Sequence, residues 1–258
     1  MSDGEVRTER RGDVVHVTFD RPAARNAMTW RMYEQLRDIC NKLRGDANVR
    51  AVVFRGAGGK AFIAGTDIAQ FKEFKSSEDG VAYEEKMETI LSGIETLPMP
   101  TLCVIEGFAV GGGLAIAACC DLRIATPGSR FGIPVARTLG NCLSVANYAR
   151  LVASIGMPRA KKMLLLAENI SAEEALAGGF LIEIVQPDHV DKRVAELTER
   201  LVHNAPVTMR VTKEAMRRLL HAAFQNGDDL VRQAFGSEDF RAGVAAFVDK
   251  KEPRWKGK

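Results

Sequence analysis

The sequence predicts an α/β fold whose C-terminal part is helical. Strand-like and helix-like segments alternate through the first half of the chain, and helical periodicity dominates from Ser144 onward. The length of 258 residues suffices for one large domain or two small ones, and no low-complexity linker divides the chain. We therefore expect a sheet-containing core that continues into a set of helices.

The first half contains short apolar segments of the kind that form buried strands. Segments with helical spacing lie between them, and glycines or prolines mark the boundaries. Thr29 is a suitable N-cap for the first helix. The predicted strands are 14–19, 51–54, 101–105 and 122–125, the predicted helices run from Thr29 to about Arg44 and over 78–96 and 114–120, and a glycine-rich turn is expected at 107–113. The order suggests a strand–strand–helix rhythm.

The second half is predicted to be almost entirely helical. Pro158 and Pro206 suit the first turns of helices, where a missing N–H costs nothing. The predicted helices are 144–155, 158–167, 171–177, 190–204, 206–226 and, in pieces, 228–248.

Composition excludes several classes of protein. Hydrophobic residues make up 46% of the chain and charged residues 27%, which argues against a disordered, collagen-like or disulfide-scaffold protein. The most apolar run, Leu114–Cys120, is far shorter than the roughly 20 residues of a membrane span, and the N-terminal residues lack the apolar core of a signal peptide. The net charge of +3 gives no reason to expect nucleic acid as a partner. We expect a cytoplasmic protein with no membrane partner.

The cysteines and histidines predict no metal site. The five cysteines and four histidines show neither C-x-x-C nor any other metal-ligand spacing. Cys103, Cys119 and Cys120 lie in apolar segments, which is typical of reduced, buried thiols.

Two glycine-containing segments, 60–68 and 106–114, have the composition of a site that stabilises negative charge. A helix beginning at the triple glycine 111–113 would point unpaired N–H groups into open space, where an oxygen with developing negative charge would bind. Alternatively, the glycines only let a helix pack closely against the sheet. Neither segment matches the G-x-G-x-x-G or P-loop pattern of nucleotide sites.

Several motifs in order along the chain resemble the enoyl-CoA hydratase/isomerase (crotonase) family. They are Asp20-Arg21-Pro22-x-x-Arg25-Asn26-Ala27-Met28, Ala61-Phe62-x-Ala64-Gly65-x-Asp67-Ile68, Gly107-x-Ala109-x-Gly111-Gly112-Gly113, Cys120-Asp121-Leu122-Arg123-Ile124-Ala125, Phe131-Gly132-x-Pro134, Ser171-Ala172-Glu173-Glu174-Ala175 and Ser237-Glu238-Asp239-Phe240. The resemblance covers essentially the whole chain. It implies a crotonase-like spiral of strand–strand–helix turns over 1–195 and a helical trimerisation region over 196–258, in one continuous domain. It also implies a homotrimer or a dimer of trimers.

The same resemblance implies an acyl-CoA thioester substrate and no separate cofactor, because coenzyme A is part of the substrate. The thioester oxygen would accept hydrogen bonds from the backbone N–H groups of Ala64 and Gly112. The residues that match the family's coenzyme A contacts are Ala24, Arg25, Ala27, Thr66, Asp67, Ile68 and, from the end of the chain, Phe247 and Lys250.

The chain departs from the family at the two positions that usually hold catalytic glutamates. These positions are occupied by Ala115 and Val135, which can neither accept nor deliver a proton. Classical hydratase chemistry is therefore not expected. In the adjacent stretch 136–144, Arg137 is a candidate for pairing with a substrate carboxylate and Asn141 for positioning water.

Four functions remain open on the sequence. The leading one is an acyl-CoA lyase or isomerase that stabilises a thioester enolate without the two glutamates. A malonyl-type acyl-CoA decarboxylase would need the oxyanion hole alone, because the leaving carboxylate supplies the electrons. A non-catalytic acyl-CoA binder would keep the same loops. An RNA-binding family member would use basic clusters such as 159–162, although the low net charge argues against it.

Overall fold

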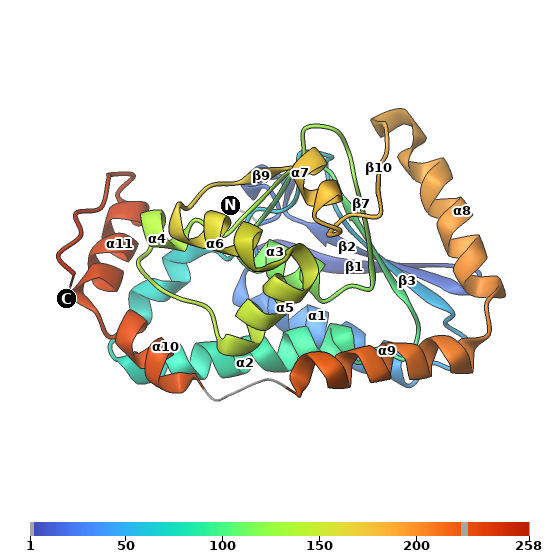
Figure 1. Ribbon diagram of the computed structural model, residues 1–258, viewed down its shortest axis with the longest axis horizontal. Helices are drawn as coiled ribbons and strands as arrows, with labels where there is room; N and C mark the ends of the chain where they lie inside the picture. Colours follow the sequence, from blue (N-terminus) through green and yellow to red (C-terminus); the bar gives the residue numbers. More distant parts are fainter. Residues whose placement is uncertain (1–2, 223–226, 258) are drawn as a thin grey trace.

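Two β-sheets form the core of the protein (Figure 1). The structure, a computed structural model, describes residues 3–222 and 227–257. The first sheet has the order β1-β2-β3-β5-β7-β10, and the second has the order β4-β6-β8-β9. The strands of the first sheet are β1 (Glu5–Arg11), β2 (Val14–Asp20), β3 (Ala51–Gly56), β5 (Thr101–Ile105), β7 (Leu122–Ala125) and β10 (Glu183–Ile184), and those of the second are β4 (Ala61–Ile63), β6 (Phe108–Val110), β8 (Arg130–Gly132) and β9 (Ile170–Ser171).

The chain visits the two sheets alternately, and this produces a spiral. A strand of the first sheet is followed by a strand of the second and then by a helix, as in β3-β4-α2 and β5-β6-α3, where α2 is Ser77–Glu95 and α3 is Gly112–Ala118. Within each sheet the successive strands pair in parallel, with antiparallel pairing only at β1–β2 and β8–β9 among the described strands. The predicted α/β class and the spiral implied by the resemblance are confirmed.

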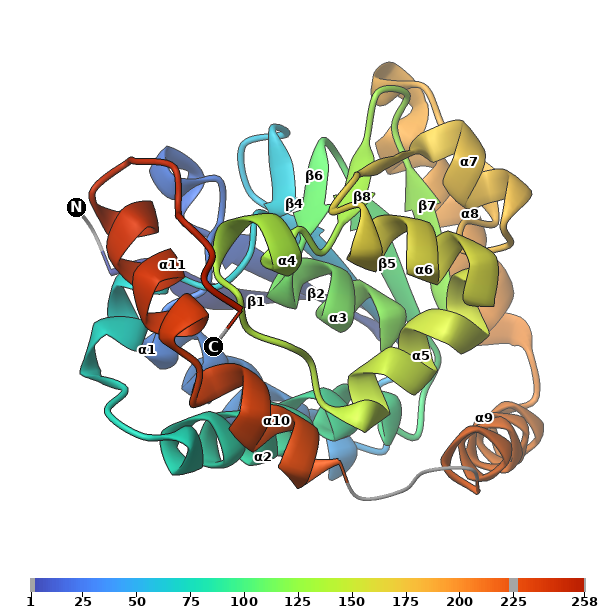
Figure 2. The ribbon, with the colours of Figure 1, turned by 60° about the vertical axis from the view of Figure 1, so that its left-hand side comes forward.

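The remaining helices cover both faces of the first sheet and form the C-terminal part (Figures 1 and 2). Figure 2 shows α9 at the edge of the protein, where it contacts α5, and no described residue of α9 is buried. The helices are α1 (Trp30–Arg44), α4 (Val135–Thr138), α5 (Val145–Ile155), α6 (Met157–Leu165), α7 (Ala172–Ala177), α8 (Val190–His203), α9 (Pro206–His221), α10 (Asp228–Phe235) and α11 (Glu238–Val248), with 3₁₀ turns η1 (Pro22–Ala24), η2 (Ile68–Glu73) and η3 (Pro187–His189).

Several boundaries differ from the predicted ones. The helix α3 begins at Gly112, inside the segment predicted as a turn, and β6 also lies there. The predicted boundary between residues 195 and 196 falls within α8, so the chain is continuous at that point. Residues 223–226, the predicted end of the helix 206–226, lie outside the described residues. In the described part of the chain, no helix combines the length and apolar character needed to cross a membrane.

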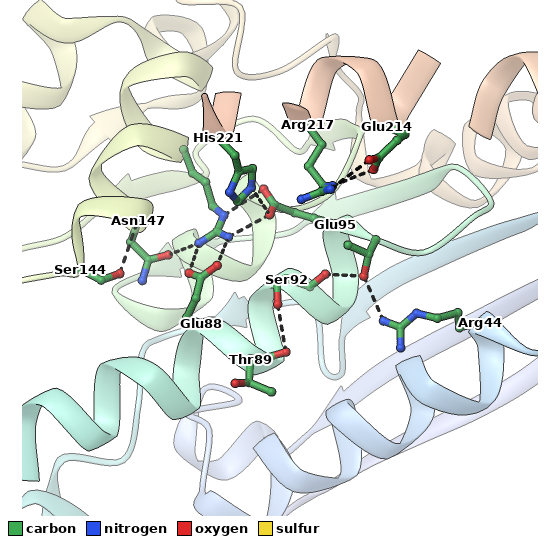
Figure 3. A network of polar contacts seen from close by, with 12 residues as sticks. Arg44, Glu88, Thr89, Ser92, Glu95, Ser144, Asn147, Glu214, Arg217 and His221 are labelled. Atoms are coloured by element: carbon green, nitrogen blue, oxygen red, sulfur yellow. Dashed lines mark hydrogen bonds and ion pairs between the residues drawn. The ribbon is translucent and has the colours of Figure 1, made fainter. Parts of the chain in front are cut away.

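A buried ion network ties α2 to α5 and α9 (Figure 3). Arg150 of α5 is 1% exposed. It donates two hydrogen bonds of 2.6 Å to Glu88. It donates two more, of 2.8 and 2.9 Å, to Glu95. Its guanidinium also donates to Asn147 Oδ1 at 3.1 Å. His221 of α9 lies 3.3 Å from Glu95 Oε2. Burial disfavours the charged guanidinium, but the bonds to the carboxylates outweigh this cost and raise the pKa of Arg150.

Candidate active site

The start of α3 presents an unpaired backbone donor. Gly111 has φ 55° and ψ −123°, a conformation that only glycine adopts without strain, and it turns the chain from β6 into α3. Its own N–H donates to Gly132 O at 2.8 Å. Gly112 is the first residue of the helix, and its N–H has no acceptor among the described residues.

A second unpaired donor lies at Thr66. Met28 pairs with this segment in a parallel bridge, donating to Gly65 O at 2.9 Å and accepting from Asp67 N at 2.8 Å. In an extended segment successive N–H groups alternate in direction, so the N–H of Thr66 points away from Met28. No backbone acceptor for the Thr66 N–H exists within residues 3–222 and 227–257.

Gly112 and Thr66 are adjacent. A Cβ atom on Gly112 would lie 3.1 Å from Thr66 Oγ1 and only 2.4 Å from the Tyr33 hydroxyl oxygen. Tyr33 Oη and Thr66 Oγ1 are themselves 2.8 Å apart, within hydrogen-bond distance. Burial raises the pKa of Tyr33 to about 12, so its hydroxyl stays protonated. The two neighbouring N–H groups therefore form a candidate oxyanion hole.

The prediction that Ala64 supplies one of these donors is wrong in this structure. The N–H of Ala64 donates to Arg25 O at 3.1 Å, which occupies it within the chain. The free donor of the segment 64–67 is instead Thr66, which the sequence analysis placed among the coenzyme A contacts. Gly112 remains the other candidate donor.

The segments 24–27 and 66–68, both predicted to contact coenzyme A, lie close together in the structure. The parallel bridge between Met28 and Thr66 joins them. Asn26 is fully buried and donates to Ala57 O at 2.9 Å and Ala61 O at 2.8 Å, which fixes the loop against β4. The Arg25 guanidinium lies over the Phe108 ring, 5.4 Å from its centroid. The Asp67 carboxylate forms an ion pair of 2.9 Å with Arg21 and caps η2, so its charge is neutralised inside the protein.

The candidate contacts from the end of the chain lie on and just after α11. This helix packs against η2, which begins at Ile68, the last residue of the segment 66–68. Phe247 is 49% exposed, and Lys250 is exposed in a left-handed conformation with φ 56°. Their role in coenzyme A binding remains a prediction, as do the roles of Ala24, Ala27 and Ile68.

Positions 115 and 135, where the family's glutamates would stand, carry no proton-transfer group. Ala115 and Val135 are partly buried and pack against the hydrophobic core. Arg137 on α4 is exposed and forms no ion pair with the described residues. The Oδ1 atom of Asn141 is buried and lacks a hydrogen-bond partner in the described structure, which suits a residue that binds water or substrate. Burial raises the pKa of Cys142 to about 12, so it is not a thiolate nucleophile.

The sequence analysis missed one buried carboxyl group, that of Glu84 in α2. Glu84 is 6% exposed, and its Oε2 accepts a hydrogen bond of 2.8 Å from Ser144 N. Burial raises the pKa of Glu84 to about 7, and hydrogen bonds from Ser144 and Asn147 only partly oppose this shift. Helical spacing could have placed Glu84 on a buried face, but nothing in the sequence distinguishes it from the other acidic residues of α2.

Comparisons with known proteins identify the family. The sequence profile of the enoyl-CoA hydratase/isomerase family matches residues 9–258. A short-chain-enoyl-CoA hydratase of Clostridium acetobutylicum is 33% identical over 256 residues, which covers 98% of this chain and 97% of that protein. A crystal structure of methylmalonyl-CoA decarboxylase complexed with 2S-carboxypropyl-CoA matches with a TM-score of 0.89 at 27% identity over 100% of both chains. An enoyl-CoA hydratase/carnithine racemase structure from Magnetospirillum magneticum gives a TM-score of 0.81 at 29% identity, over 100% of this chain and 97% of that one. The chain belongs to the enoyl-CoA hydratase/isomerase family.

Proposed function

We propose that this protein is an acyl-CoA enzyme that stabilises a thioester enolate between the backbone N–H groups of Thr66 and Gly112. The observation that carries the proposal is the adjacency of these two unpaired donors, with Thr66 Oγ1 at 3.1 Å from a Cβ built on Gly112. Two N–H donors aimed at the thioester oxygen stabilise the negative charge that develops there. The loop 24–27 and the segment 66–68 would hold the coenzyme A part of the substrate beside them.

The reaction is not classical two-glutamate hydration. Ala115 and Val135 have no group that moves a proton or activates water. Isomerisation or hydration through a different proton-transfer group uses the same oxyanion hole, because both reactions develop charge on the thioester oxygen. A protein that only binds acyl-CoA would also keep the hole but would show no turnover.

Decarboxylation of a malonyl-type acyl-CoA is the second candidate. When carbon dioxide leaves, the electrons of the broken C–C bond form the enolate, so no base is needed to generate it. The methylmalonyl-CoA decarboxylase structure superposes with a TM-score of 0.89, against 0.81 for the hydratase/racemase structure. The guanidinium of Arg137, which is exposed and forms no ion pair with a described residue, is suited to hold a substrate carboxylate.

A panel of thioesters separates these reactions. Purified protein is incubated with crotonyl-CoA, a 3-enoyl-CoA and methylmalonyl-CoA, and hydration, isomerisation and carbon dioxide release are measured. We expect turnover of the 3-enoyl or the methylmalonyl thioester and no rapid hydration of crotonyl-CoA. Hydration of crotonyl-CoA at an ordinary enzymatic rate would overturn our interpretation of Ala115 and Val135. Calorimetric binding without turnover of any thioester would favour the non-catalytic binder.

We also propose that the chain assembles as a homotrimer or a dimer of trimers. The helix α9 exposes a set of apolar side chains that a monomer would leave in water: Val207, Val211, Met216 and Leu219, which are 58%, 60%, 65% and 78% exposed. Light scattering is expected to give a mass of three or six chains. A monomeric mass would contradict this assembly.

A further inference from the structure

We propose that Glu84 is the proton-transfer group of this site, the residue that takes a proton from the α-carbon of the bound thioester or returns one to it. The inference rests on the proposed enolate chemistry. It names the group that transfers the proton, which Ala115 and Val135 cannot do. Four observations carry it: the place of Glu84 on a helix that packs against the elements bearing Tyr33 and Gly112, its tether to the loop after α4, its burial, and the absence of an ion pair with any described residue.

The helix α2 places Glu84 near the two backbone donors. It packs against α1, which carries Tyr33, and against α3, which begins with Gly112. The ring of Tyr83, the residue before Glu84, lies 5.6 Å from the ring of Trp30, and the Trp30 ring lies 6.1 Å from that of Tyr33. Tyr33 contacts Thr66. The charge of Glu84 raises the pKa of Tyr33, in addition to burial, which is consistent with this proximity.

The carboxyl group is held from the opposite side by the segment between α4 and α5. Ser144 N donates to Glu84 Oε2 at 2.8 Å, and Ser144 is the N-cap of α5. Asn141, with its buried and unpaired Oδ1, belongs to the same segment. Glu84 is thus attached to the stretch that follows position 135, where the family's second glutamate would stand.

Glu84 differs from the other acidic residues on its face of α2. Glu88 and Glu95 lie one and three turns further along the helix, and both are neutralised by Arg150. No Lys, Arg or His forms an ion pair with Glu84 in the described parts of the chain. A buried carboxyl group without a cation holds its proton to a higher pH, and with a pKa of about 7 it exists in both forms near neutrality. The titratable or charged groups around it are Tyr33 from α1, Tyr83 and Glu88 from α2, Cys142 from the preceding loop, and Tyr148 and Arg150 from α5.

The proposed step is a balanced proton transfer. Ionised Glu84 takes the α-proton, the C–H electron pair forms the enolate C=C bond, and the thioester oxygen becomes an oxyanion that accepts from the N–H groups of Thr66 and Gly112. In the reverse direction, protonated Glu84 returns the proton to the α-carbon. If the substrate loses carbon dioxide instead, the same protonated carboxyl group supplies the proton to the enolate and regains one from water.

Exchange of the α-protons of butyryl-CoA with D₂O, followed by NMR, tests this step without knowledge of the natural acyl group. We expect the wild-type protein to catalyse exchange and Glu84→Gln to lose at least about 10²-fold of the rate. Gln keeps the shape and the acceptor for Ser144 N, and it introduces no buried charge. The matched control is Glu85→Gln, which changes the adjacent, exposed carboxylate and should keep the wild-type rate. Glu84→Asp, which keeps a carboxyl group on a shorter side chain, should retain part of the rate.

The pH profile and the binding constant complete the test. The wild-type rate should rise with pH through a pKa near 7, because the ionised form of Glu84 is the base, and this step should disappear in Glu84→Gln. The affinity of both proteins for butyryl-CoA, measured by calorimetry, should be similar. Exchange by Glu84→Gln at the wild-type rate, in a wild-type protein that does exchange the α-protons, would overturn the role of Glu84. Failure of the proposed function would differ, because the wild-type protein itself would then show no exchange, whether or not butyryl-CoA binds.

Discussion

Replacing Gly112 by proline is expected to reduce turnover by about 10²–10³-fold, the cost of removing one oxyanion-hole donor. Proline at this position breaks no hydrogen bond of the helix, because the N–H of the first residue of a helix has no acceptor within the helix. The expected loss therefore comes from the thioester oxygen, whose developing charge would be stabilised by Thr66 alone. The rate of butyryl-CoA exchange, or of whichever thioester proves to be turned over, measures it.

A second effect of proline has to be separated from the loss of the donor. Any Cβ on Gly112 would lie 2.4 Å from the Tyr33 hydroxyl, which is closer than such atoms can approach. We therefore place the substitution in a Tyr33→Phe background, where this oxygen is absent. Gly112→Ala in the same background is the matched control, since it adds the Cβ and keeps the N–H. Equal rates for the alanine and proline variants would show that the Gly112 N–H does not serve the reaction.

The spiral core could be predicted because its buried strands are continuous apolar segments. The strands β2, β3, β5 and β7 coincide with segments predicted as strands. The strand β1 was missed because six of its seven residues are exposed and most are charged; its pairing with β2, not its composition, makes it a strand. The three-residue strands β4, β6 and β8 are too short to show a period of their own, and only pairing with neighbouring strands defines them.

The candidate site was predictable only where it depends on local conformation. The free N–H at Gly112 follows from the triple glycine at a helix start. The second donor does not, because the choice between Ala64 and Thr66 depends on their pairing with Arg25 and Met28, about 40 residues earlier in the chain. Glu84 was hidden for a related reason. Arg150, a residue of another helix, pairs with Glu88 and Glu95 on this face of α2 and leaves Glu84 without an ion pair in the described structure.

Replacing Arg150 by methionine is expected to destabilise the folded chain by about 3–5 kcal/mol, the range for removing one partner of a buried ion pair. The Glu95 side chain is 9% exposed, and its carboxylate would keep His221 as a partner but lose the guanidinium that forms two hydrogen bonds with it. Urea unfolding at one fixed protein concentration measures the loss, because assembly makes stability depend on concentration. The triple variant Arg150→Met, Glu88→Leu, Glu95→Leu should recover most of it, since the two carboxylates that lose the guanidinium are then also removed.

The control for the Arg150 variant is an exposed ion pair between α10 and α2. Arg232 and Glu78 approach to 2.6 Å, but their side chains are 45% and 64% exposed, so Arg232→Met should leave the unfolding midpoint unchanged. If Arg150→Met behaved like Arg232→Met, burial of the network would not matter. The network also reaches α9 through Glu95 and His221, and a second polar anchor of this helix, which has no buried residue, is Lys213, bonded to Met99 O and Asp121. We therefore expect Arg150→Met to loosen α9 before the core unfolds, which faster amide exchange in α9 than in β5 would show.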